Sequence, residues 1–158
     1  MLILASNLSN TPVMSLQTGS QLARTGRAII DPSNLQILAY ELKANTFLNQ
    51  EMLVRIADIR ELSRVGFIVD SGEDFILPDD VFKIKEILDL NFNLLDLRVE
   101  DEKKRKIGKI IDYTISLSNF SVQQLIVKRP FIKSFSDPTL TIHRSQIIEI
   151  NDNKIVIQ

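Results

Sequence analysis

Short runs of apolar and β-branched residues, separated by turn-forming residues, recur along most of this chain. The clearest run is residues 95–99, Leu-Asp-Leu-Arg-Val, where apolar and polar positions alternate as in a half-buried β-strand. Pro32-Ser33-Asn34 is a typical turn between two such runs. The pattern predicts strands at residues 13–16, 28–31, 35–42, 53–56, 67–69, 95–99, 110–117, 122–127, 140–142 and 155–157. Residues 59–62 are predicted to form a short turn.

One segment has the period of a helix instead. Residues 78–90 begin with Pro-Asp-Asp, which suits a helix N-terminus, because the acidic side chains meet the positive end of the helix dipole. An apolar stripe follows, formed by Val81, Ile84, Ile87 and Leu88, with Phe82 as a further candidate. We expect this helix to link two β-rich units and to bury its stripe against one or both of them.

The chain repeats itself. Residues 59–62, Ile-Arg-Glu-Leu, are followed after four residues by Phe-Ile-Val, and residues 147–150, Ile-Ile-Glu-Ile, are followed after four residues by Ile-Val-Ile. Upstream, Gly26-Arg-Ala-Ile-Ile-Asp is matched by Gly108-Lys-Ile-Ile-Asp. Matched beginnings and ends in the same order predict a tandem duplication of one small β-rich unit. Gly26 and Gly108 are then predicted to be structural glycines, at a bulge or tight bend.

These repeated segments resemble the PRC-barrel superfamily, which includes the cytoplasmic domain of the photosynthetic reaction-centre H subunit and the C-terminal domain of ribosome maturation factors. The resemblance lies in the opening Leu-Ser-Asn-Thr-Pro-Val at residues 8–13, in the Gly-basic-x-Ile strand of each half, and in the closing segments 54–69 and 142–157. It implies an all-β fold of two small PRC-barrel-like β-barrels in tandem with a short linking α-helix. The expected boundaries are 1–77 for the first unit, 78–91 for the linker helix and 92–158 for the second unit.

Composition narrows the chemistry. The 158 residues carry a formal net charge of −1 and no cysteine, which excludes disulfides, thiolate catalysis and cysteine-based zinc sites. The first residues lack the basic and apolar regions of a signal peptide, and no stretch approaches the roughly 20 apolar residues of a membrane span. We therefore expect a cytoplasmic protein without a membrane span.

The sharpest charge cluster is at residues 103–109, Lys-Lys-Arg-Lys-Ile-Gly-Lys. Its Lys103, Lys104 and Arg105 are candidate contacts to phosphates of a nucleic acid. The alternative is a solvated hairpin tip whose charges discourage edge-to-edge pairing of strands. The acidic residues 100–102 precede the cluster directly, and no aromatic residue is interleaved for stacking on bases, so the hairpin tip is the favoured interpretation.

A second candidate site is the loop that follows residue 128. Its Arg129, Phe131 and Phe135 combine the residue types that anchor protein interfaces, and the second repeat is longer here than the first. The alternative is that the two phenylalanines fill a barrel end. Loops on rigid scaffolds often carry function, so these three residues are the predicted partner-binding residues.

Other titratable residues do not assemble into a site. His143 is the only histidine, which makes it a poor metal ligand or catalytic base, and it aligns with Arg55 of the first repeat. Asp31 and Asp112 stand at strand ends, where Asp is a routine turn residue. We therefore expect no catalytic residue, cofactor or metal.

The resemblance and the residues together predict a non-catalytic cytoplasmic adaptor that binds a protein partner through its β-barrel surfaces. The alternative is an RNA- or ribosome-associated assembly factor that uses the basic cluster. The identity of the partner and the oligomeric state do not follow from the sequence.

Overall fold

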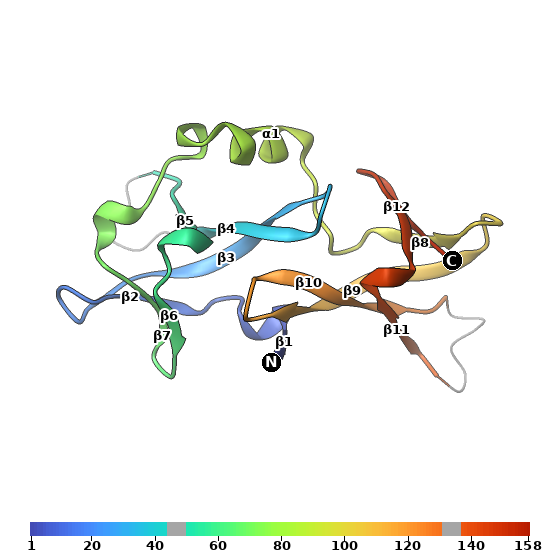
Figure 1. Ribbon diagram of the computed structural model, residues 1–158, viewed down its shortest axis with the longest axis horizontal. Helices are drawn as coiled ribbons and strands as arrows, with labels where there is room; N and C mark the ends of the chain where they lie inside the picture. The colour runs from blue at the N-terminus through green and yellow to red at the C-terminus, as the bar shows by residue number, and fades with distance from the viewer. Residues whose placement is uncertain (44–49, 131–136) are drawn as a thin grey trace. The chain divides into compact units, whose positions relative to one another are not determined.

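The computed structural model of the chain describes residues 1–43, 50–130 and 137–158. Over these residues the protein is mostly β-structure with a single α-helix, α1 (Phe82–Leu90) (Figure 1). This confirms the prediction of a β-rich chain with one helix. Short 3₁₀ turns connect several strands, namely η1 (Ala5–Asn7), η2 (Ile56–Asp58), η3 (Gly72–Asp74), η4 (Pro78–Asp80) and η6 (Arg144–Gln146).

The chain divides into two compact units. The first unit comprises Asn7–Ile30 and Ile37–Leu90, and the second comprises Met1–Ser6, Asp31–Gln36 and Asn91–Gln158. The strands of the first unit are β2 (Pro12–Ser15), β3 (Gln21–Asp31), β4 (Gln36–Lys43), β5 (Leu53–Arg55), β6 (Glu61–Ser63) and β7 (Gly66–Val69). Those of the second are β1 (Leu2–Leu4), β8 (Arg98–Asp101), β9 (Lys106–Ser116), β10 (Ser121–Lys128), β11 (Thr139–His143), β12 (Ile147–Ile150) and β13 (Lys154–Ile157).

Both units have the same strand order. In the first unit the order is β5-β4-β3-β2-β7-β6, and in the second it is β11-β10-β9-β8-β13-β12. Each order contains one parallel pair, β2 with β7 and β8 with β13, among otherwise antiparallel neighbours. A 3₁₀ turn, η2 or η6, stands at the same place in each unit. This is the arrangement that a duplicated unit predicts.

Among the described residues, each hydrogen-bonded path has two ends, β5 and β6 in one unit and β11 and β12 in the other. The pairing is therefore that of an open sheet, whereas the PRC-barrel resemblance implies closed barrels. The coarse fold class, a β-rich chain with one helix, is unaffected by this difference.

The two repeats align differently from the sequence pattern around their glycines. Ala23 stands opposite Val13 in the first unit, and Gly108 stands opposite Val99 in the second, so Gly108 occupies the place of Ala23. The pairing of Gly26 with Gly108 is wrong by three residues. The sequence pattern does not reveal this three-residue error, because neither β3 nor β9 alternates strictly between buried and exposed residues.

Several predicted boundaries also change. The turn predicted at residues 59–62 is instead η2 (Ile56–Asp58) followed by β6 (Glu61–Ser63). The strand predicted at residues 95–99 begins only at Arg98, because Asp96 has a positive φ of 70° and belongs to a turn. β1 has no counterpart among the predicted strands, and it pairs with the end of β9 through Leu2 and Ser116.

α1 packs on the first unit. Its Ile84 and Ile87 are buried in a cluster with Ile29, Ala39 and Leu53, which lie on β3, β4 and β5. Phe82 was a candidate for the same stripe, yet it is 80% exposed, because it stands on the opposite side of the helix. Figure 1 shows α1 beside β4 and β5.

The matching positions of the second unit are polar. The strand registers place Thr114, Gln124 and Thr141 where the first unit has Ile29, Ala39 and Leu53. Thr114 donates a hydrogen bond to the side chain of Gln124 at 3.3 Å. The duplicated unit therefore has an apolar face under α1 in one copy and a hydrogen-bonded polar face in the other.

Candidate functional site

The second unit has a cleft of about 390 Å³ whose lining includes four cationic side chains and one carboxylate. We call it the basic cleft. Its lining residues are Asp96, Lys106, Gly108, Lys109, Ile111, Lys128, Arg129 and Pro130. The strands β9 and β10 supply most of them, and all of them belong to the second unit.

Strand register aligns cations across the sheet beside this cleft. Lys109 on β9 stands directly opposite Lys128 on β10 and opposite Arg98 on β8. Arg98 in turn stands beside Lys154 of β13. We call Arg98, Lys109, Lys128 and Lys154 the cation row. Directly paired residues point to the same face of a sheet, so the four side chains share one face.

Most of these charges lack a counter-ion. Lys154 contacts Glu100, with 3.1 Å between Nζ and Oε2. Over the described part of the chain, no ion pair is formed by Arg98, Lys106, Lys109, Lys128 or Arg129. Like charges directly opposite each other destabilise a sheet. Folding alone therefore does not account for this arrangement.

Gly108 lets the backbones of β9 and β10 meet at the floor of the cleft. Its φ is +154°, and a Cβ atom here would lie 2.1 Å from the carbonyl oxygen of Lys128. Gly26 differs, because it has no positive φ and its Cβ would lie 3.3 Å from the carbonyl oxygen of Glu41. Of the two, only Gly108 combines a positive φ with a close backbone approach.

Arg129 lies at the edge of the basic cleft. Its Nε atom is buried and has no hydrogen-bond partner, although its backbone N–H donates to the carbonyl oxygen of Pro138 at 2.9 Å. A buried donor without a partner carries a desolvation cost. Phe131 and Phe135, the other two predicted partner-binding residues, lie outside the described residues.

The tip of the β8–β9 hairpin carries Lys103, Lys104 and Arg105. The carboxylate of Asp101 accepts hydrogen bonds from the backbone N–H groups of Lys103 and Arg105, both at 2.9 Å, and pairs with Arg105 Nε at 2.6 Å. These contacts hold the pKa of Asp101 below its ordinary value, with the backbone hydrogen bond from Arg105 as the largest cause. Arg105 is thus engaged in the turn, while Lys103 and Lys104 extend into solvent.

The first unit lacks an equivalent of the cation row. β3 and β4 match β9 and β10 in length, which places Arg24 and Lys43 at the positions of Lys109 and Lys128. The Arg24 guanidinium group donates to the backbone carbonyl oxygen of Asn10 at 2.8 Å, and Lys43 Nζ donates to the side-chain Oδ1 of Asn10 at 3.4 Å. Pro12 stands opposite Arg24, where the second unit has Arg98. In the first unit, the side chains of Arg24 and Lys43 are therefore held by hydrogen bonds to Asn10 of the same unit.

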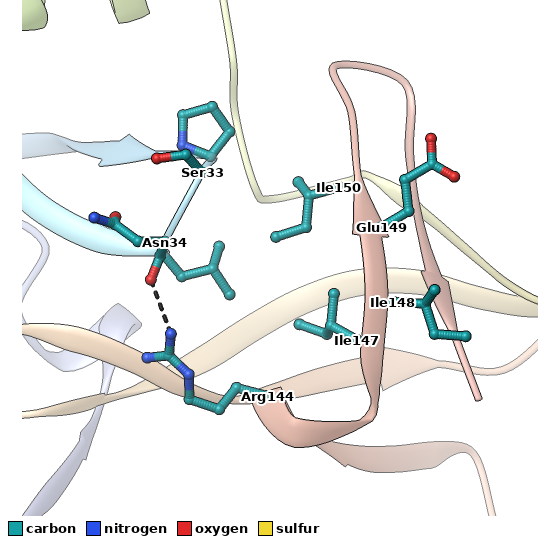
Figure 2. A pocket seen from close by; sticks show the side chains of 9 residues that line it. Ser33, Asn34, Arg144, Ile147, Ile148, Glu149 and Ile150 are labelled. Carbon is teal, nitrogen blue, oxygen red and sulfur yellow. Dashed lines mark hydrogen bonds between the residues drawn. The ribbon is translucent and has the colours of Figure 1, made fainter.

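Another hollow of the second unit, of about 320 Å³, lies between the β3–β4 turn and β12. Figure 2 shows Ile147 and Ile150 pointing into it, and Ile148 and Glu149 pointing away. The guanidinium group of Arg144 donates to the carbonyl oxygens of Asn34 at 2.9 Å and Val122 at 3.0 Å. Arg144 thus holds the turn in place, and Glu149 is the other charged residue of the lining.

The first unit has a pocket of about 420 Å³ beside Arg27, Glu41 and Leu88. Arg27 pairs with Glu41 at 2.8 Å, and Glu51 also lines this pocket, so its lining has a net negative charge. The basic cleft differs in the net positive charge of its lining.

The remaining titratable residues have local structural contacts. The imidazole of His143 caps η6 by accepting the N–H of Ser145 at 3.1 Å, and Arg55 precedes η2 at the equivalent place, as the repeat predicts. Asp31 accepts from Ser33 at 2.7 Å, and Asp112 accepts from the hydroxyl of Ser6 at 2.6 Å. Within the described ranges, no group of three His, Cys, Asp or Glu side chains is placed to hold a metal ion.

Sequence reasoning found part of the cleft. Arg129 and the 103–109 cluster were recognised, whereas Arg98, Lys128 and Lys154 were not. A signal was available, because Lys109 and Lys128 lie equally far from the ends of the β9–β10 hairpin, Ser116 and Ser121. Each strand has one bulge, so the two extra residues cancel and Lys109 still pairs with Lys128.

No protein-family model matches this chain, and no curated protein matches it either. In the part of the chain that the structure describes, no helix is long and apolar enough to cross a lipid bilayer.

Proposed function

We propose that this protein is a non-catalytic adaptor of the cytoplasm, built from two PRC-barrel-like units in tandem, and that it binds a protein partner through the second unit. Two properties support the PRC-barrel part of the proposal. The repeated segments resemble that superfamily, and six strands in each unit follow the same order with one parallel pair.

The observation that carries the binding function is the basic cleft with its cation row. Lys154 pairs with Glu100, but Arg98, Lys109 and Lys128 form no ion pair or side-chain hydrogen bond among the described residues. At the equivalent positions of the first unit, Arg24 and Lys43 donate hydrogen bonds to Asn10. An exposed set of uncompensated charges is suited to a partner of opposite charge. Of the three predicted partner-binding residues, Arg129 lines the cleft, and Phe131 and Phe135 follow it in the sequence outside the described residues.

The test is a cross-linked pull-down from the native cell, read by quantitative mass spectrometry, with and without nuclease. One bait is the wild-type protein, and a second carries Lys109→Ser and Lys128→Ser. A third bait carries Arg24→Ser and Lys43→Ser, which removes the same number of charges at the equivalent positions. We expect protein partners that survive nuclease, are lost from the second bait and are retained by the third. Partners shared equally by all three baits would contradict the proposal.

A second function, an RNA- or ribosome-associated assembly factor, is favoured by the same cations together with Lys103 and Lys104 at the hairpin tip. It requires RNA affinity that falls steeply with salt and weakens when Lys103, Lys104 and Arg105 become Ser. Fluorescence anisotropy with a labelled RNA duplex at several salt concentrations measures both properties. Binding that is absent or independent of salt would remove this alternative.

A further inference from the structure

Three adjacent strands carry cations in direct register. Arg98, Lys109 and Lys128 are all exposed, and each faces another cation across a strand pair. The strands are about 4.8 Å apart, so the three backbone positions span about 10 Å across the sheet. A ligand that neutralises all three must therefore extend across the strands and carry more than one negative charge.

The cleft also has apolar lining. Ile111 is 46% exposed, and it is the extra residue at the bulge in β9, where the register passes from Asp112 directly to Ile110. Pro130 lines the cleft beside Arg129. An apolar side chain of a ligand would bury the exposed Ile111, which a sugar-phosphate backbone does much less well.

The residue types of the lining favour a peptide over a nucleic acid. Asp96 lines the cleft and Glu100 pairs with Lys154 of the cation row, and these two carboxylates repel the phosphates and the carboxylates of a ligand alike. Among the described lining residues, none is aromatic, so no platform for base stacking is present.

An extended acidic peptide fits the spacing of the cation row. Side chains two residues apart on an extended peptide point to the same side and lie about 7 Å from each other. The long side chains of lysine and arginine accommodate the difference from the strand spacing. Arg129 lines the edge of the cleft and provides one more cation for a side-chain carboxylate of the peptide.

We infer that the basic cleft binds an acidic segment of a protein partner, with an apolar residue between carboxylates, lying across β8, β9 and β10. This inference rests on the proposed adaptor function and specifies the chemistry of the partner. The carboxylates pair with Arg98, Lys109 and Lys128, and the apolar residue contacts Ile111.

The test uses the full chain and three labelled probes. The first is the peptide Glu-Glu-Ile-Glu-Glu with blocked ends, the second replaces each Glu by Gln, and the third is a short RNA duplex. NMR titration should shift the amide resonances of Gly108, Lys109 and Lys128 with the acidic peptide and leave them unmoved with the Gln peptide. Raising the salt from 50 to 500 mM should weaken the binding at least tenfold (an order-of-magnitude expectation).

Variants locate the site. Lys109→Ser with Lys128→Ser should reduce affinity for the acidic peptide about tenfold or more, because two charge pairs are lost. The matched pair Arg24→Ser with Lys43→Ser should leave it unchanged. Thermal unfolding of both double variants checks that they fold. Equal loss in both, or absence of saturable binding, would overturn the inference, and so would tighter binding of the RNA duplex at the same residues.

The failure of this inference and that of the adaptor proposal have different signatures. If a nuclease-resistant partner depends on Lys109 and Lys128 but the acidic peptide does not bind, the adaptor proposal stands and the acidic-segment inference fails. If the peptide binds but no cellular protein depends on these lysines, the adaptor proposal fails while the site chemistry stands.

Discussion

Gly108 is the residue on which the geometry of the basic cleft depends most directly. Its positive φ and its proximity to the Lys128 carbonyl oxygen leave no room for a side chain. The sequence indicates a special glycine at this position, because a glycine within an Ile-rich strand is unusual. The sequence does not show that Gly26 and Gly108 occupy different positions of the repeated unit, since the strand register is needed to distinguish them.

We predict that Gly108→Ala destabilises the protein by about 2–4 kcal/mol, because it combines a conformation strained for any other residue with a backbone clash. Gly72→Ala is the matched control, since its Cβ would lie 3.9 Å from Leu22 and its φ is not positive. Urea unfolding of both variants measures the difference. Similar stability of the two variants would show that the β9–β10 contact adjusts without cost.

Asp101 supplies a second prediction for a single residue. Its pKa is lowered from the ordinary value of 3.8, so its stabilising effect is present above that pH and is lost as the pH falls through the lower pKa of the folded state. Asp101→Asn should lower the melting temperature at pH 6, and the difference from wild type should disappear as the pH falls well below 3.8. A difference that does not change with pH would mean that the hairpin tip does not depend on the carboxylate charge.

The strand pair β9–β10 brings Lys109 and Lys128, which are far apart in the sequence, into direct register. Residues 110–117 and 122–127 were predicted as hairpin strands, and the observed strands contain them. The two compensating bulges do not follow from the sequence, because they depend on how each strand bends within the unit. Because the two bulges cancel, Lys109 meets Lys128 as it would in a regular hairpin, and the extra residue of β9, Ile111, is exposed.

We predict that Lys109→Thr makes the protein more stable while it weakens the proposed ligand binding. Removing one of two like charges that face each other should raise the free energy of unfolding by about 0.2–1 kcal/mol. For a chain of this size, that corresponds to an increase in melting temperature of roughly 1–4 °C. Differential scanning calorimetry at low and high salt measures it, and the gain should shrink at high salt as the charges are screened.

The equivalent strand position in the first unit is the control for this prediction. Arg24→Thr removes a hydrogen bond to the carbonyl oxygen of Asn10, so no gain in stability is expected. A gain of equal size in both variants would mean that general charge reduction, and not the cation row, is responsible.

On the scale of the whole molecule, each unit has its own core. Ile87 belongs to the cluster of the first unit, and Ile142 is buried in the second with 1% of its surface exposed. We predict that Ile87→Ala, at a cost of about 2–5 kcal/mol, lowers amide exchange protection mainly in the first unit. Ile142→Ala should lower amide exchange protection mainly in the second unit. Hydrogen-exchange mass spectrometry measures the loss of protection in each unit for both variants. Equal loss of protection across the chain in both variants would mean that the units unfold as one.

The duplication and the β-rich composition could be recognised from the sequence because apolar strand ends and turn residues are local signals. The strand registers, the open strand paths and the pairing of β1 with β9 could not be recognised from the sequence. They depend on pairings between residues far apart in the chain. β1 is an example: Leu2–Leu4 has no local partner, and its pairing with β9 joins residues more than a hundred positions away.

The polar triad Thr114, Gln124 and Thr141 has a consequence for the order of the repeats. The first copy needs the helix that follows it in the chain, since Ile29, Ala39 and Leu53 would otherwise face water. The second copy has no such need. The two copies are therefore no longer interchangeable. A circularly permuted chain that separates the first copy from residues 82–90 should aggregate through that face, whereas a cut between the helix and the second copy should leave the apolar face of the first copy covered.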